Sequence, residues 1–121
     1  MIKKKIKGNI INISSQLGHI GAYNRTAYCM TKFGLEGLTK SMALDLAKHK
    51  IRVNSVSPTK TIVNPNEFKK TKKRLNKIKS KIPLGKFSTA EEIAGITFFL
   101  TTDIANSITG TSIISDGGWT A

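Results

Sequence analysis

Short apolar runs, each interrupted by polar residues, predict three strands. They occupy residues 9–14, 52–57 and 112–115. Runs of this length are typical of strands in a parallel sheet that is buried on both faces. The sequence therefore predicts an α/β fold, and it offers only three strands from which to build the sheet.

A longer segment, residues 24–48, predicts a helix because its apolar residues recur at spacings of three and four. This apolar stripe consists of Leu35, Leu38, Met42 and Leu46. We expect the stripe to face the core. Gly34 and Gly37 lie in the same segment, and a glycine inside a helix costs about 1 kcal/mol relative to alanine. We therefore expect another element to pack closely against these two positions, and packing within one subunit is one of the possibilities.

Two shorter motifs predict where elements begin and end. Ser88 and Thr89 precede Glu91 and Glu92 at the start of an apolar segment, an arrangement typical of a capped helix. The Asp-Gly-Gly sequence at residues 116–118 predicts a turn after the last strand.

Lysine dominates the charge of the chain. The net charge is +13, from 20 basic and 7 acidic side chains, and the densest cluster covers residues 68–81. Four apolar side chains in and directly after this cluster could share one helical face; they are Phe68, Leu75, Ile78 and Ile82. That pattern is typical of an amphipathic helix that caps a core, and also of a helix that binds nucleic acid. Only three of the basic residues are arginine, which phosphate and base recognition favours, so we expect salt-sensitive attraction to polyanions without specific nucleic-acid recognition.

The first eight residues, MIKKKIKG, form a basic lead-in to a continuous unit over residues 9–121. No apolar core of a secretory signal follows these lysines, and no run approaches the roughly 20 apolar residues of a membrane span. Cys29 is the only cysteine, which excludes an intramolecular disulfide and is typical of a reducing compartment. We expect a cytoplasmic protein that does not bind membranes and has no metal site, because no metal signature is present.

Candidate chemistry gathers around the first predicted strand and the helix after it. Ser14 and Ser15 end the strand, and in open α/β sheets ligands bind beyond the carboxyl ends of strands. Tyr28 and Lys32 follow at a spacing of four, which makes them neighbours on one helical face. Such a pair can form without purpose, but a nearby ammonium group also favours the ionised form of a phenol and so suits it to proton transfer. The serines supply the third group that proton transfer at a substrate oxygen would need.

Taken together, the motifs resemble a known family. NISSQLG is followed by YCMTK, whose tyrosine comes thirteen residues after Ser15, and then by KIRVNSVSP, IPLGKF and TGTSIISDGG. In this order they resemble the carboxyl-terminal half of short-chain dehydrogenases/reductases over residues 8–119. YCMTK, HKIRVNSVSPT and IPLGKF are most similar to the branch of that family that reduces L-xylulose and dicarbonyl compounds.

The resemblance implies a partial Rossmann-like fold of three layers, with the last three strands and their helices. It implies an NAD(P)-dependent oxidoreductase acting on a small carbonyl or polyol, with either NAD or NADP as cofactor and NADP slightly favoured. Tyr28 would be the general acid/base, and Lys32 would favour its ionised form and bind the nicotinamide ribose. Ser15 would hydrogen-bond the substrate oxygen, and Gln16 would also contact the substrate. The long helix would join an intersubunit bundle in a homo-oligomer.

Two departures from the family pattern affect the cofactor site. The loop after the second strand would touch the nicotinamide through Pro58, Thr59 and Thr61, but Val63 stands where the family has a threonine. The glycine-rich fingerprint of the family and its Asn-Asn-Ala-Gly strand are absent from these 121 residues. A glycine-rich turn at a helix amino terminus is what binds the pyrophosphate of a dinucleotide.

These observations leave three functions open. The chain could belong to an active enzyme once an amino-terminal half completes it, or it could be a truncated, inactive remnant. A basic module that associates with nucleic acid is the third. We expect the isolated chain to be inactive, and we expect the uncovered edge of its first strand to favour association.

Overall fold

Three parallel strands form the centre of the computed structural model, which describes residues 1–63 and 67–121 and the side chains of residues 1–63 and 73–121. They are β1 (Gly8–Ile13), β2 (Ile51–Pro58) and β5 (Ser112–Ser115), in the order β1-β2-β5. Ile10 pairs with Val53 and Ser57 pairs with Ile114, so β2 is the central strand. All three predicted strands are confirmed to within two residues at each end.

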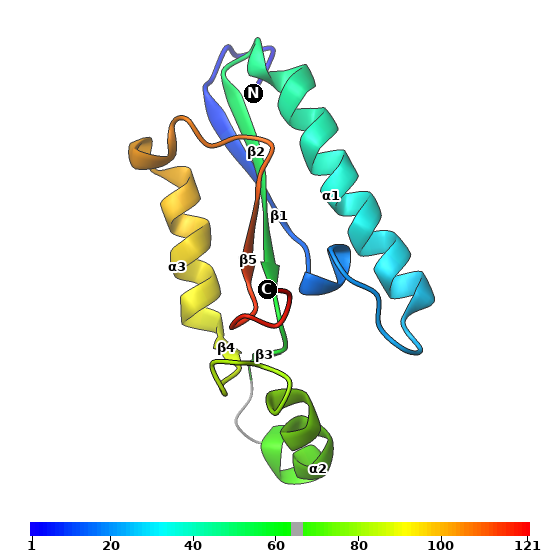
Figure 1. Cartoon of the computed structure of the whole chain (residues 1–121). Coiled ribbons are helices and arrows are strands. Elements are labelled where there is room, and N and C mark those ends of the chain that lie inside the picture. The colour runs from blue at the N-terminus through cyan, green and yellow to red at the C-terminus, as the bar shows by residue number, and fades with distance from the viewer. Residues whose placement is uncertain (64–66) are drawn as a thin grey trace.

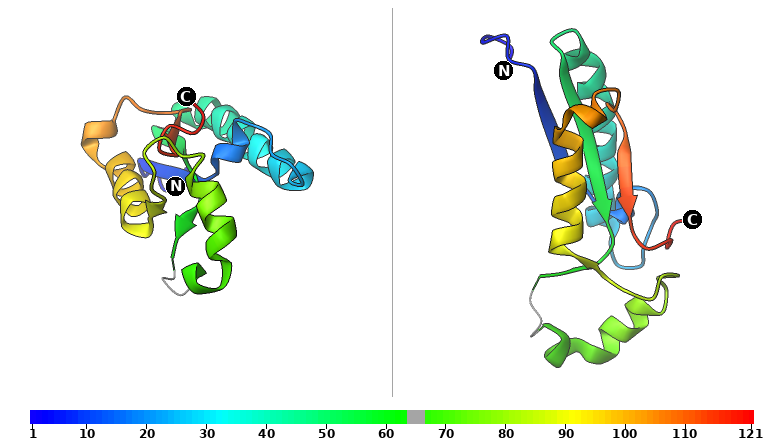
Figure 2. Two further views of the ribbon diagram at one scale, coloured as in Figure 1. Left: turned by 60° about the horizontal axis from the view of Figure 1, so that its bottom comes forward. Right: turned by 90° about the vertical axis from the view of Figure 1, so that its left-hand side faces the viewer.

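Two helices cover the two faces of this sheet (Figure 1). Helix α1 (Thr26–Ala47) connects β1 to β2 and packs on β2, and α3 (Ala90–Thr101) lies against β1 and β2 on the other face. Figure 2 shows the resulting order of helix, sheet and helix in its left view. The three-layer α/β prediction is confirmed. The carboxyl ends of the strands all point toward the lower end of the molecule in Figure 1.

A smaller unit lies beyond that lower end. It contains the short parallel strands β3 (Thr61–Ile62) and β4 (Ser88–Thr89) and the helix α2 (Glu67–Lys79). Leu75, Ile82 and Phe87 are buried together in a small apolar cluster. This confirms the amphipathic helix and two of its predicted buried positions, whereas Phe68 lies outside the described side chains. The basic residues of the same segment that the structure describes are exposed, as expected of a solvated face; they are Lys73, Arg74, Lys77, Lys79 and Lys81.

The apolar stripe predicted on α1 is only partly correct. Leu38 is half exposed, and the residues of this helix that are buried are Glu36, Thr39 and Ala43. The helix is therefore rotated so that a partly polar face meets the sheet, where Thr39 accepts a hydrogen bond from the Asn12 side chain at 2.9 Å. Leu35 and Met42 flank this face and are partly buried.

Gly34 and Gly37 also differ from the prediction. A Cβ atom added to either glycine would have no neighbour within 4 Å among the described residues. Tight packing within one subunit, one of the two alternatives for these glycines, is therefore not found among the described residues. Both glycines lie on the side of α1 that the sheet does not cover.

The predicted cap and turn are both present. The Thr89 side chain accepts a hydrogen bond from the Glu92 backbone N–H at 3.2 Å, and the Glu92 carboxylate accepts one from the Thr89 N–H at 2.9 Å. This reciprocal pair is a capping box, and it satisfies two donors at the start of α3. Gly117 and Gly118 have φ angles of 65° and 89°, so the turn after β5 uses a conformation that favours glycine.

Strand β1 lies at an edge of the three-stranded sheet as the described residues build it. Several large apolar side chains are also exposed on the helices, namely Met30, Phe33, Leu38 and Leu44 on α1 and Phe98 and Phe99 on α3. An unpaired edge beside exposed apolar side chains favours association with another polypeptide.

Leu100 provides a test of this packing. Its side chain is fully buried where α3 meets the sheet, so we expect Leu100→Ala to lower the free energy of unfolding by about 2–5 kcal/mol. Leu44→Ala makes the same chemical change at a side chain that is 81% exposed, and it should change that free energy by no more than about 0.5 kcal/mol. Urea denaturation followed by circular dichroism measures both, and equal losses would contradict the core described above.

Candidate active site

The two serines lie where β1 ends. The Ser14 backbone N–H donates to the Val56 carbonyl at 2.8 Å, which extends the alignment with β2 by one residue. Ser15 begins the short 3-10 helix η1 (Gln16–Gly18), and its hydroxyl accepts a hydrogen bond from the Leu17 N–H at 3.2 Å. This bond fixes the Ser15 side chain at the carboxyl edge of the sheet.

Tyr28 and Lys32 lie one turn apart at the start of α1. The Lys32 Nζ atom is 5.7 Å from the centroid of the Tyr28 ring, and it donates a hydrogen bond to the Ile13 carbonyl at 3.0 Å. Because Ile13 is the last residue of β1, this bond ties the tyrosine-bearing helix to the strand that leads into Ser15. Tyr28 is 44% exposed, which leaves its ring accessible to a ligand.

The loop after β2 reaches the same edge of the sheet. The Thr59 N–H donates to the Ser115 carbonyl at 3.0 Å, which holds the loop against the end of β5. Thr59 is buried, and its hydroxyl has no hydrogen-bond partner among the described residues. The Thr61 hydroxyl donates to the Thr59 carbonyl at 3.3 Å, whereas Val63 is exposed. Pro58 is the last residue of β2, so the three residues predicted to touch a cofactor are close in space to one another.

Gln16 lies deeper than a substrate-contacting residue is expected to lie. Its side chain is buried, and its Oε1 atom has no partner among the described residues. A buried amide oxygen without a partner is costly, so this atom is a candidate acceptor for a ligand.

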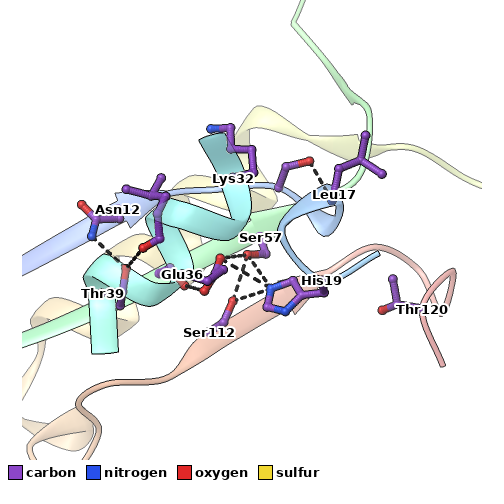
Figure 3. Close-up of polar contacts among 12 residues, drawn as sticks. Asn12, Leu17, His19, Lys32, Glu36, Thr39, Ser57, Ser112 and Thr120 are labelled. Atoms are coloured by element: carbon purple, nitrogen blue, oxygen red, sulfur yellow. Dashed lines mark hydrogen bonds and ion pairs between the residues drawn. The ribbon is translucent and has the colours of Figure 1, made fainter. Parts of the chain in front are cut away.

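A buried cluster of polar side chains lies directly behind these residues, and the sequence motifs did not reveal it. The Glu36 carboxylate accepts hydrogen bonds from the Ser55 hydroxyl at 2.7 Å and from the Ser57 hydroxyl at 2.8 Å. The His19 Nε2 atom lies 3.5 Å from the same carboxylate and within hydrogen-bond distance of Ser57 and Ser112, at 3.1 Å and 3.2 Å. Figure 3 shows His19, which directly follows η1, together with Glu36 on α1, Ser57 on β2 and Ser112 on β5, all pointing toward one another. We call Glu36, His19, Ser55, Ser57 and Ser112 the Glu36 cluster.

The Glu36 cluster holds η1 against α1. Gly18 closes η1, and a Cβ atom added there would lie 3.0 Å from the Lys32 carbonyl oxygen and 3.1 Å from the Glu36 Cγ atom. So close an approach favours glycine, and it packs η1 tightly against the turn of α1 that carries Lys32 and Glu36. One sequence signal points to Glu36, although not to its partners: Glu36 follows Lys32 by four positions, so it lies one turn further along the same face.

Burial acts to raise the pKa of the Glu36 carboxyl, but the neighbouring hydroxyls of Ser14, Ser55 and Ser57 and the adjacent His19 together hold it below its usual value. Three groups able to donate hydrogen bonds therefore favour the ionised form, as hydrogen bonding to a carboxylate does in general. The cluster is built around a negative charge.

Within the described residues, no group of three or more His, Cys, Asp or Glu side chains could hold a metal ion. No described helix is both long enough and apolar enough to cross a membrane. Cys29 is partly buried, and its thiol lies 3.9 Å from the Ile20 carbonyl oxygen.

Comparison with known proteins identifies the class. A family model described as enoyl-(acyl carrier protein) reductase matches residues 1–120. L-xylulose reductase from Mus musculus is 40% identical over 126 residues, which cover the whole of this chain and 50% of that protein. The chain belongs to the short-chain dehydrogenase/reductase family, and it spans about half the length of the curated relatives it matches.

Solved structures support this assignment. A 4-hydroxyisoleucine dehydrogenase complexed with NADH superimposes with a TM-score of 0.90 at 39% identity, covering 98% of this chain and 49% of that one. A protein described as a 2-deoxy-d-gluconate 3-dehydrogenase from Agrobacterium tumefaciens, with bound NADP, gives a TM-score of 0.89 at 33% identity and covers 98% and 48%. The predicted family and Rossmann-like fold class are confirmed.

The charge of Glu36 predicts a pH-dependent stability. Because the pKa of Glu36 is lower in the folded chain than its ordinary value of 4.5, its contribution is complete above that value and is lost as the pH falls through the folded pKa. We expect Glu36→Gln to lower the free energy of unfolding by about 1–3 kcal/mol at neutral pH. The difference from the unchanged protein should shrink as the solution is acidified below pH 4.5.

Urea denaturation at a series of pH values measures this difference. Glu91→Gln provides the matched control, since it removes the same charge from an exposed position on α3. A Glu36→Gln difference that stayed constant from neutral pH to the acid limit would show that the carboxylate charge is not what the cluster requires.

Proposed function

We propose that this chain provides the catalytic half of an NAD(P)-dependent oxidoreductase, with Ser15, Tyr28 and Lys32 as the catalytic residues. The observation that carries the proposal is the Lys32 side chain, which lies beside the Tyr28 ring and also bonds the end of the strand leading to Ser15. A phenol, an ammonium group and a hydroxyl near the same end of the sheet would suit proton transfer at a substrate oxygen, which supports the proposal. Membership of the family makes this arrangement the expected one.

Each residue would have a distinct role in reduction. The Tyr28 hydroxyl donates a proton to the carbonyl oxygen, and the Lys32 ammonium group stabilises the phenolate that remains. The Ser15 hydroxyl donates a hydrogen bond to the same oxygen and orients the carbonyl group. The bound nicotinamide supplies hydride. Oxidation of an alcohol would use the same groups in reverse.

The residues of this chain fit the nicotinamide end of the cofactor. Tyr28 and Lys32 would bind the nicotinamide ribose, and the loop of Pro58, Thr59 and Thr61 would contact the nicotinamide. The buried Thr59 hydroxyl, which lacks a partner among the described residues, supports this assignment. The solved relatives hold NADH in one case and NADP in another, so both are candidates, and we favour NADP slightly because a similar protein from Sus scrofa is named as an NADPH-dependent carbonyl reductase.

The pyrophosphate end of the cofactor needs residues that this sequence does not contain. We propose that turnover requires an amino-terminal half with the glycine-rich turn, either on the same polypeptide or on another. The edge of β1 and the exposed apolar side chains of α1 and α3 would bind that half or a second copy of the chain. The open surface at Gly34 and Gly37 would allow a close helix contact in a homo-oligomer.

The substrate is proposed to be a small carbonyl compound or alcohol. The similar proteins are named for a ketose, a hydroxylated amino acid and a sugar acid, which share a secondary alcohol or a ketone. Ser15 and Gln16 would contact the substrate. A cytoplasmic location is proposed as well, since it suits the single cysteine.

The catalytic assignment is tested in a protein that has the amino-terminal half restored. Tyr28→Phe removes the proton donor and keeps the ring, so we expect kcat for carbonyl reduction to fall by at least about 100-fold. Lys32→Met should lower kcat and raise the KM for the cofactor together. Lys40→Met changes an exposed lysine of the same helix and should leave both constants unchanged. Wild-type turnover in the phenylalanine variant would exclude Tyr28 as the acid/base group.

The isolated 121-residue chain should bind the cofactor weakly. Its remaining contacts are a few hydrogen bonds of about 0.5–1.5 kcal/mol each, which must offset an association cost of at least about 4 kcal/mol. We therefore expect Kd values above about 1 mM for both NADH and NADPH, measured by nucleotide fluorescence. Saturable micromolar binding would mean that the chain builds a complete cofactor site by itself, for example across an oligomer interface.

A further inference from the structure

A cavity of about 540 Å³ opens beside the catalytic residues. One wall is the segment that follows Ser15 and Gln16, and the other is formed by the segment after α2 and the turn after β5. The residues that line the cavity are Leu17, Ile20, Gly21, Ala22, Tyr23, Lys81 and Trp119. We call it the Trp119 cavity.

Two contacts connect the Trp119 cavity to the catalytic groups. The Leu17 N–H donates to the Ser15 hydroxyl at 3.2 Å, so the first wall begins at the serine that would hold the substrate oxygen. The Cys29 thiol lies 3.9 Å from the Ile20 carbonyl oxygen, which joins the same wall to the residue next to Tyr28. The wall of the cavity is therefore bonded directly to the Ser15 side chain and packs on the turn of α1 that carries Tyr28.

The lining of the cavity is apolar with a single cation. Leu17, Ile20 and Ala22 are aliphatic, and Tyr23 and Trp119 add aromatic surface. Among the described side chains that line the cavity, Lys81 is the only charged one, and its Nζ atom lies 5.7 Å from the centroid of the Trp119 ring. A polyol would need several polar partners, because specificity in such sites comes from a few placed polar groups. The lining instead fits an apolar body with one anionic group.

The wall that carries this cation is fixed by the chain around it. The Asp116 carboxylate accepts hydrogen bonds from the Gly118 N–H at 2.9 Å and from the Thr120 N–H at 2.8 Å, which closes a turn around Trp119. Ile82, next to Lys81, is buried and packs so closely on Gly117 that an added Cβ atom would lie 2.5 Å from its Cγ2 atom. The backbone at Lys81 and at Trp119 is therefore fixed on the same wall of the cavity, with the Lys81 ammonium group near the Trp119 ring.

We propose that the substrate is a small carboxylic acid that carries its reacting ketone or alcohol on an apolar body, and that Lys81 binds the carboxylate. This proposal rests on the function proposed above and specifies its substrate class. Lys77 and Lys79 are exposed on the neighbouring end of α2, and the chain carries a net charge of +13, so the approach to the cavity attracts anions.

Trp119 is the only tryptophan in the chain, so its fluorescence reports on the cavity without turnover or cofactor. We would titrate the 121-residue chain with 5-oxohexanoate and with the neutral 5-oxohexanamide at constant ionic strength. The acid should quench the fluorescence saturably and bind about fivefold more tightly than the amide, as expected for one hydrogen-bonded charge pair at a partly exposed site.

Two variants test whether Lys81 causes the preference for the acid. Lys81→Gln should remove the preference for the acid while circular dichroism remains unchanged, and Lys79→Gln, which loses the same charge outside the cavity, should keep it. Equal affinities for acid and amide in the unchanged chain, no saturable binding of the acid, or a preference that survives Lys81→Gln would each overturn the proposal. None of these results depends on Tyr28 chemistry, so the proposed oxidoreductase function is tested separately by the turnover of the Tyr28 variant.

Discussion

The negative charge of Glu36 is the constraint on which the candidate active site depends. A carboxylate buried between a helix and a sheet needs donors, and Ser55, Ser57 and the nearby His19 meet that need from different elements. Removing one partner from such a network leaves a buried polar group unsatisfied, which costs more than the bond itself contributes. The cluster therefore specifies how η1, α1, β2 and β5 fit together, and does not merely add to their stability.

This polar contact also explains the unusual surface of α1. Its buried face contains Glu36 and Thr39, so several of its larger apolar side chains remain outside, among them Leu38 and Leu44. Hydrogen bonds hold such a helix in position on the sheet, and its larger apolar side chains remain exposed on the opposite side. The polar contacts with the sheet and the exposed apolar side chains thus occupy different faces of one helix.

Much of the fold could be predicted from the pattern of apolar residues along the sequence. Strands of a parallel sheet are buried on both faces, so they appear in the sequence as apolar runs. The positions of Ser15, Tyr28 and Lys32 at one edge followed from the order of strand, turn and helix. The Glu36 cluster could not be predicted, since His19, Ser57 and Ser112 become neighbours only when the chain is folded. Periodicity also failed for the face of α1, because apolar spacing does not reveal that a carboxylate takes the buried position.

The edge position of β1 has a consequence for how the sheet opens. Backbone groups in a parallel strand alternate between its two neighbours, so only every second amide of β1 is bonded to β2. Those amides would exchange slowly with deuterium and the ones between them rapidly. At residues 55 and 56, β2 is paired with a strand on each side, and the amides there would exchange last. The central strand would then be the last part of the sheet to open. The free edge of β1 is where a strand of another polypeptide can pair most easily.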